Sequence, residues 1–358
     1  MNMEAAAGSD SIHILCIGTD EDAAPRHVRK WLETTPMEGL DLITEFDGAL
    51  EEGLLRLEEG EVDLLAISAS VWYERNAARD TRVATALPRR EENHILVADD
   101  RPAYLPFKSI ILSANRLQRR QLRRYRPDFR VMSPKAFADT VGRAEPPESG
   151  LALQAYLEDL RATKVINGYV SERHLFSAAD VDARRHALMT DPRQGESVRF
   201  LPSPLQGLTL LIGRKAFPTT LSDRIGDFES ETAWECEKIL LDGIDVELRD
   251  RVGMVVRHRQ IPSLLKQAEW QKDLLRSTSL LDPDGKLVDT GARIEVLLEA
   301  VGRNGTRTLL LERLLKRGAA STAVRLMLVE WDRMLQSVTM EHEEDVRLGA
   351  ARPAFLDL

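Results

Sequence analysis

Seven arginines fall within the fifteen residues 116–130. They follow an apolar run at residues 109–112, so the pattern predicts a buried strand that leads into a short basic helix. Guanidinium groups bind carboxylates and phosphates through paired hydrogen bonds, and the free N–H groups at a helix N-terminus attract the same anions. The segment therefore has two interpretations: an anion-binding site, or a solvated basic face that pairs with the chain's many acids.

Other reactive residue types show no spacing that is typical of a metal or nucleophile site. His94 follows Glu91 and Glu92, but no second histidine lies at a metal-ligand spacing. Cys16 and Cys236 are too few for a disulfide framework or a Cys-rich metal site. The sequence also lacks a glycine-rich phosphate loop and a GxSxG motif. We therefore predict no metal site, and the catalytic residues, if there are any, stay unknown.

Composition limits the class of protein. The chain has 358 residues, of which 43% are apolar, enough for two or three domains with their own cores. The net charge of −9 disfavours a nucleic-acid partner, since such proteins usually carry an excess of basic residues. No run approaches 18 apolar residues, and the N-terminus lacks the basic and apolar regions of a signal peptide. Because two dispersed cysteines suit a reducing compartment, we expect a cytoplasmic protein without a membrane segment, and a monomer.

Strands alternate with helices in the first part of the chain, which predicts α/β architecture with a largely parallel or mixed sheet. Ligands of such sheets bind at loops past the C-terminal ends of the strands. Beyond a Pro-rich turn, the sequence indicates a smaller α+β unit with a hairpin at residues 282–286. The predicted strands are 11–19, 61–68, 109–112, 164–170 and 208–213. The predicted helices are 20–34, 46–59, 150–163, 230–241 and an amphipathic region at 306–340 with a break near Gly318.

The order of these segments resembles that of the hydroxymethylbilane synthase (porphobilinogen deaminase) family over roughly residues 11–315. The arginine segment, with Gln121-Leu122 and Arg126-Pro127-Asp128-Phe129, is similar to the family's S-L-R-R-x-x-Q-L…R-P-D-L pattern. Leu201-Pro202 followed by Gln206-Gly207 is similar to its L-P-x-x-G-Q-G pattern. Asp282-Pro283-Asp284-Gly285 and residues 298–310 resemble the hairpin and helix of the family's third domain.

This resemblance implies a three-domain α/β fold. Two halves would be like those of a periplasmic binding protein, with the chain crossing twice between them, and a small α+β domain and a C-terminal helical extension would follow. The implied limits are 11–104 with 202–222 for domain 1, 105–200 for domain 2, 225–313 for domain 3, and 314–358 for the helical extension and tail.

The family condenses porphobilinogen into a linear tetrapyrrole on a dipyrromethane cofactor, which a cysteine of domain 3 holds. Arginines and a lysine bind the acetate and propionate groups. By resemblance and by residue type, the substrate-binding candidates are Ser113, Asn115, Arg116, Arg119, Arg120, Lys135 and Gln206. We expect Arg116, Arg119, Arg120 and Gln206 to line one cleft.

The chain departs from the family at the residues that carry the chemistry. The Lys-Asp of the catalytic turn falls at Ser70-Val71, and valine cannot exchange protons. The Arg and Ser of the first turn fall at Asp20 and Asp22. No cysteine lies near residues 243–246, where the cofactor is attached, and Cys236 comes two to three helical turns earlier. We therefore expect no bound dipyrromethane.

Two functions remain open. One is a divergent hydroxymethylbilane synthase of tetrapyrrole biosynthesis, a transferase that condenses porphobilinogen. The alternative is a catalytically inactive paralogue that binds a small polycarboxylate, or a partner protein, in the interdomain cleft.

Overall fold

The computed structural model describes residues 10–19, 21–37, 39–75, 80–191, 198–287, 291–340, 342–345, 350–352 and 355–358. Asp20, in the acidic first turn, lies outside these ranges. By compactness the chain divides into two units, which we describe separately. Unit 1 comprises Met1–Asn115, Asp128–Thr190 and Leu205–Trp234, and unit 2 comprises Arg116–Pro127, Asp191–Pro204 and Glu235–Leu358. None of the described helices is both long and apolar enough to cross a bilayer.

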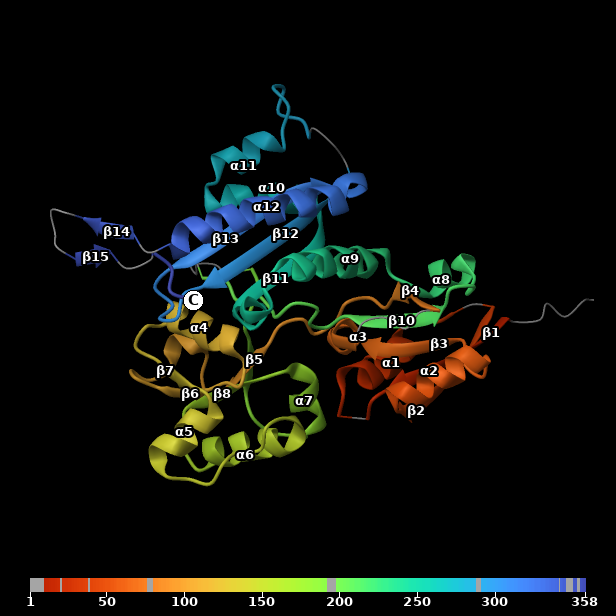
Figure 1. Cartoon of the computed structure of the whole chain (residues 1–358), viewed down its shortest axis with the longest axis horizontal. Helices are drawn as coiled ribbons and strands as arrows, with labels where there is room; N and C mark the ends of the chain where they lie inside the picture. Colours follow the sequence, from red (N-terminus) through yellow and green to blue (C-terminus); the bar gives the residue numbers. More distant parts are fainter. Residues whose placement is uncertain are drawn as a thin grey trace, which may run out of the picture. The chain divides into compact units, whose positions relative to one another are not determined.

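The first sheet of unit 1 has the strand order β2-β1-β3-β10-β4 (Figure 1). β1 runs parallel to β2 and β3, whereas β10 runs antiparallel to β3 and β4. The strands are β1 (Asp10–Ile17), β2 (Leu40–Gly48), β3 (Leu64–Ser68), β4 (Thr81–Ala86) and β10 (Thr209–Arg214). The helices are α1 (Ala23–Thr34), α2 (Leu50–Glu59), α3 (Ala69–Arg75) and α8 (Thr219–Ile225).

Both faces of β1 are buried, because successive side chains of a strand point to opposite faces. Ile14 and its even-numbered neighbours share a core with Trp31 of α1. Leu15 and Ile17 face α2, where a Cβ built on Gly53 would lie 2.8 Å from Cδ1 of Ile17. The glycine thus lets α2 pack closely, and the consecutive apolar residues 14–17 reflect cover on both sides of the strand.

The second sheet of unit 1 has the order β7-β6-β8-β5-β9. β6 is parallel to β7 and β8, and β5 is antiparallel to β8 and β9. The strands are β5 (Ile95–Ala98), β6 (Ile110–Leu112), β7 (Arg130–Met132), β8 (Gly168–Ser171) and β9 (Arg185–Ala187). The helices are η1 (Pro102–Tyr104), α5 (Pro134–Val141), α6 (Gly150–Ala162) and α7 (Arg173–Ala178).

The two sheets of unit 1 share one topology. In the first sheet β1 lies between two parallel neighbours, as β6 does in the second. In both sheets the fourth strand in spatial order, β10 or β5, is antiparallel to the strands on either side of it. The chain passes from the first sheet to the second between β4 and β5, and it returns between β9 and β10. The predicted α/β fold with two α/β halves, between which the chain crosses twice, is confirmed.

Unit 2 is built on the antiparallel sheet β11-β12-β13. Its strands are β11 (Val252–Gln260), β12 (Ala292–Val301) and β13 (Thr308–Lys316), with the pair β14 (His342–Asp345) and β15 (Ala350–Arg352) forming a separate ladder. Its helices are α4 (Arg116–Tyr125), η2 (Val246–Arg251), α10 (Ile261–Gln271), α11 (Leu274–Ser279), η3 (Arg317–Ala319) and α12 (Ala320–Thr339). α9 (Phe228–Gly243) spans the boundary between the units.

Several predicted elements differ from the structure. The helix predicted at residues 46–59 begins only at Leu50, because Phe46 belongs to β2 and is part of its alternating burial pattern. The helical region predicted from residue 306 is wrong up to Lys316, since β13 occupies it. Leu309, Leu311 and Leu315 are buried there at strand spacing, so the leucines suit a helix but the pattern is that of a strand. The turn at residues 282–286 is confirmed, with the Asp282 N–H donating to the Lys286 carbonyl at 2.7 Å.

Two elements fall within the predicted limits of one domain but belong to another sheet or unit in the structure. β5 lies in the second sheet, although its residues fall within the limits given for domain 1. The arginine helix α4 belongs to unit 2, although its residues fall within those given for domain 2. The three-domain division with those limits stays a prediction.

Candidate functional site

The arginine helix α4 has two faces with different roles. Residues at positions 116, 119, 120 and 123 recur at the i, i+3, i+4, i+7 spacing that puts side chains on one face of a helix, and all four are arginines. The remaining positions supply Leu117, Leu122, two buried glutamines, Arg124 and Tyr125. One face therefore carries charge, while the other docks the helix within unit 2.

The docking face binds a buried carboxylate of β12. The side chain of Glu299 is 2% exposed. Its carboxylate accepts hydrogen bonds from Nη1 of Arg124 at 2.6 Å and from Nε2 of Gln121 at 3.0 Å. Nε2 of Gln121 and Nε2 of Gln118 also donate to the Leu201 carbonyl, at 3.1 and 3.3 Å. For Arg124 the structural interpretation of the basic segment therefore holds: this arginine attaches α4 to the sheet.

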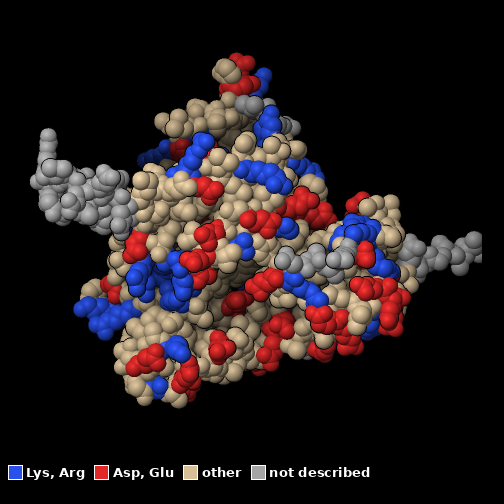
Figure 2. Space-filling model, in the orientation of Figure 1, with Lys and Arg blue, Asp and Glu red and all other residues tan. Residues whose placement is uncertain are grey.

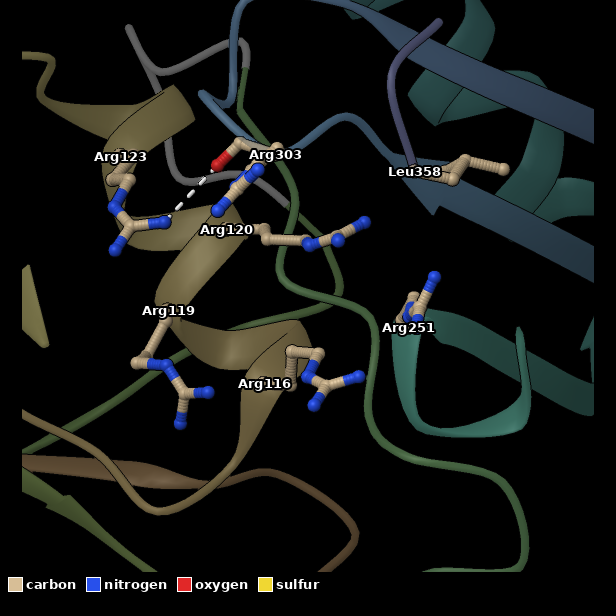
Figure 3. Close-up of a pocket in the computed structure, with 7 residues that line it drawn as sticks. All are labelled: Arg116, Arg119, Arg120, Arg123, Arg251, Arg303 and Leu358. Atoms are coloured by element: carbon tan, nitrogen blue, oxygen red, sulfur yellow. Dashed lines mark hydrogen bonds between the residues drawn. The ribbon is translucent and has the colours of Figure 1, made fainter. Parts of the chain in front are cut away.

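The charged face of α4 lines a cavity of about 400 Å³ (Figure 3). We call it the arginine cavity, and its described lining residues are Arg116, Arg119, Arg120, Arg123, Arg251, Arg303 and Leu358. Figure 3 shows the side chains of Arg116 and Arg120 extending from α4 on the side where Arg251 lies. In Figure 2, Lys and Arg atoms gather over the area where Figure 1 draws α4, on a surface of otherwise mixed charge.

Hydrogen bonds and one ion pair fix several of these guanidinium groups. Nη1 of Arg120 donates to the Val301 carbonyl at 2.8 Å, and Nη1 of Arg123 donates to the Arg303 carbonyl at 3.0 Å. Arg116 forms an ion pair of 3.0 Å with Asp250. Groups that are held in place before a ligand arrives lose less conformational entropy when it binds.

The arginines of the cavity oppose one another electrostatically. Burial, together with the positive charges of Arg251 and Arg116, lowers the pKa of Arg120 to about 10, while Asp250 acts in the opposite direction. Burial and the neighbouring Arg123 likewise lower the pKa of Arg119. The cavity therefore concentrates positive charge that an anion would stabilise.

The Arg123 guanidinium shows the same pattern at the other end of the charged face. Burial lowers its pKa, and the charge of Arg303 lowers it further. The repulsion therefore extends over the whole length of the cavity and is not confined to one pair.

The remaining predicted binding residues lie in unit 1. Ser113 is buried, and its hydroxyl donates to the Asn115 carbonyl at 3.2 Å. Lys135 is exposed and forms an ion pair with Glu145. The carbonyl of Gln206 accepts a hydrogen bond from Nε of Arg89 at 2.9 Å. The structure thus brings Arg116, Arg119 and Arg120 together, whereas a cleft shared with Gln206 stays a prediction.

Sequence reasoning missed two arginines of the cavity. Arg251 ends η2, directly before β11, and Arg303 lies in the turn between β12 and β13. Each is more than 120 positions from α4, and no local pattern distinguishes either from an ordinary surface arginine. Only the packing of α4 against β12 brings them to the same cavity.

The positions of the family's chemistry hold other residues. Ser70 and Val71 lie in the first turn of α3, where the Ser70 hydroxyl is 3.0 Å from that of Ser68 and Val71 is 46% exposed. Cys236 is 1% exposed within α9, and burial raises its thiol pKa to about 12. Among the described residues, no three His, Cys, Asp or Glu side chains are grouped so that they could hold a metal ion.

Comparison with known proteins assigns neither a family nor a function to this chain. No protein-family model matches the chain, and no curated protein matches it. Similar solved structures include an ABC transporter protein from Parabacteroides distasonis, with 12% identity, coverage of 98% of this chain and 99% of that one, and a TM-score of 0.33. The periplasmic aliphatic sulphonate binding protein from Escherichia coli shows 11% identity, coverage of 95% and 97%, and a TM-score of 0.32. TM-scores this low do not establish structural similarity. The fold is therefore assigned from the order and direction of the strands alone.

Proposed function

We propose that this chain is a binding protein whose arginine cavity holds a small molecule with several carboxylates. One observation supports this proposal most directly: six arginines line a cavity of about 400 Å³, and burial together with neighbouring arginine charges lowers the pKa of Arg119, Arg120 and Arg123. A ligand with several negative groups offsets that repulsion. Bidentate guanidinium–carboxylate pairs also add geometric specificity that lysine ammonium groups do not provide.

The dimensions of the cavity suit an elongated ligand. The Cα atoms of Arg116 and Arg123 are seven residues apart on a helix, a rise of about 10 Å. A ligand that contacts the whole charged face therefore carries acidic groups distributed over a similar length. Pyrroles with acetate and propionate substituents, such as porphobilinogen or a linear tetrapyrrole, have this character, and the family resemblance suggests them.

The proposal leaves out condensation of porphobilinogen. That reaction requires a group that exchanges protons beside the substrate, and Ser70 and Val71 occupy the corresponding turn. A buried thiol whose pKa is raised to about 12 is also a poor nucleophile for attaching a primer. We infer that the chain binds its ligand without a covalent dipyrromethane.

Isothermal titration calorimetry with porphobilinogen and with a linear tetrapyrrole tests this proposal. We expect binding that weakens as salt rises, because charge attraction is screened over about 10 Å at 0.1 M ionic strength. The double variant Arg116→Ala/Arg119→Ala should weaken binding by at least about 100-fold, since hydrogen bonds to charged groups contribute about 1.5–3 kcal/mol each.

The matched control is Arg130→Ala/Arg143→Ala, which removes the same charge from two exposed residues outside the cavity. This control should bind like the wild type. Absence of binding at low salt, or equal losses in the two double variants, would exclude the arginine cavity as a polycarboxylate site.

A further inference from the structure

A short segment near the C-terminus lies at the edge of the arginine cavity. Residues 355–358 pack within unit 2, where Leu356 is 2% exposed and its N–H donates to the Val338 carbonyl at 2.7 Å. The Arg303 N–H donates to the Asp357 carbonyl at 2.8 Å. The segment is therefore hydrogen-bonded both to α12 and to the turn that supplies a lining arginine.

Two side-chain contacts anchor this segment. Leu356 packs over Gly302, where a Cβ would lie 3.1 Å from Cδ1 of the leucine. The Arg307 guanidinium lies 4.5 Å from the centre of the Phe355 ring and donates to the Phe355 carbonyl. An apolar anchor and a cation–π contact together resist thermal release more than backbone hydrogen bonds alone.

The same segment also carries a carboxylate next to the cavity. Leu358 lines the cavity, so the chain reaches its wall directly after Asp357. The negative charge of Asp357 raises the pKa of Arg120, opposite to the effect of Arg251 and Arg116. Asp357 itself is exposed, so its carboxylate is not enclosed by other groups. It acts on the cavity as a weak counter-ion supplied by the chain itself.

We propose that residues 355–358 form an autoinhibitory gate that competes with the anionic ligand for the arginine cavity. This inference rests on the proposed function, because it concerns the same cavity. Leu356 holds the segment in place, and Asp357 supplies charge that the ligand must outcompete. When a site is open only part of the time, the apparent affinity falls by the open fraction. Releasing the segment therefore tightens binding without any new ligand contact.

Two variants test the gate by calorimetry with a linear tetrapyrrole. Asp357→Asn removes the charge, and Leu356→Ser removes the anchor. Both should bind the tetrapyrrole about three- to tenfold more tightly than the wild type, as expected if the segment is docked for most of the time. The matched control is Asp332→Asn, which removes the same charge from an exposed residue of α12 and should change nothing.

Wild-type affinity in both gate variants, with loss of binding in Arg116→Ala/Arg119→Ala, would overturn the gate and leave the proposed function intact. Loss of all tetrapyrrole binding would instead contradict the proposed function. The gate then still has a readout without ligand, namely hydrogen exchange at the Leu356 amide. Faster exchange in Asp357→Asn than in Asp332→Asn supports attraction of the segment to the arginines, and equal exchange overturns it.

Discussion

At the scale of single residues, neighbouring arginines of one helix have different roles. Arg124 forms an ion pair with the buried Glu299 and anchors the helix. Arg120, one turn earlier, is hydrogen-bonded to a backbone carbonyl and lines a cavity crowded with other cations. The sequence leaves two interpretations of the basic segment open. The structure supports pairing with an acid for Arg124, and anion binding by the arginines of the cavity stays a proposal. Which arginine pairs with an acid depends on the residues that β12 presents, and these lie far away in the chain.

The two cysteines give a prediction that is independent of any ligand. Burial raises the thiol pKa of Cys16 and of Cys236 to about 12. At pH 8 only roughly one thiol in ten thousand is then a thiolate, the reactive form. We expect almost no reaction of the native protein with a thiol reagent at pH 8, and two reacted thiols per chain after denaturation.

Reactivity of the native thiols should rise only as the pH approaches 12 or as the protein unfolds, because deprotonation is the step that burial opposes. An intact-mass measurement on the same sample should give the mass of the bare chain. A native mass that exceeds this value by two pyrrole units, and that loses the excess in Cys236→Ala, would contradict the prediction.

At the scale of elements, the two faces of α4 differ in their electrostatics. One face forms an ion pair with the sheet, and the other carries arginines whose like charges repel one another. The docking face combines an ion pair to Glu299 with two glutamine side chains that donate to Leu201. The cavity face carries arginines whose pKa values are lowered by burial and by one another. The docking face therefore stabilises the helix without cost from like charges, and an anion in the cavity would offset the repulsion on the other face.

The ion pair between α4 and β12 should contribute strongly to folding stability. In Glu299→Leu, Arg124 keeps its charge in a largely buried position, and breaking such a pair typically costs about 3–5 kcal/mol. The free energy of unfolding, measured in urea, should fall by about that amount. The control Glu330→Leu breaks the exposed pair with Arg313, which should cost no more than about 1 kcal/mol. Equal losses in the two variants would show that α4 does not depend on Glu299.

The sequence predicted the strands that are buried on both faces, but it predicted a helix for the half-buried, leucine-rich strand β13. β3 and residues 14–17 of β1 are apolar runs covered on both faces, so their patterns gave the correct strands. β13 is a half-buried strand rich in leucine, a good helix former, and tertiary packing overrode that propensity. The arginine helix was predicted from local spacing, but its place in unit 2 depends on contacts that span about 180 residues.

At the scale of the whole molecule, the arginine cavity is a local region of positive charge on a protein with a negative net charge. The net charge is −9, yet six arginines converge on one cavity. A local field of opposite sign directs small anions to one place, whereas the remaining surface repels them. The same arrangement carries a cost in the unliganded state, because like charges close together destabilise the fold that holds them.

Because of this cost, we expect the order of thermal stability of the wild type and the arginine double variant to reverse when ligand is added. Without ligand, Arg116→Ala/Arg119→Ala should unfold at the same temperature as the wild type or slightly above it, because the substitutions relieve repulsion as well as removing the pair with Asp250. With a linear tetrapyrrole at 100 times its Kd, the wild type should gain about 2.7 kcal/mol, which raises its Tm by several degrees. The double variant should gain almost nothing, so the order of the two proteins reverses. Arg130→Ala/Arg143→Ala should follow the wild type in both conditions, and a ligand-induced shift of equal size in all three proteins would place the tetrapyrrole elsewhere.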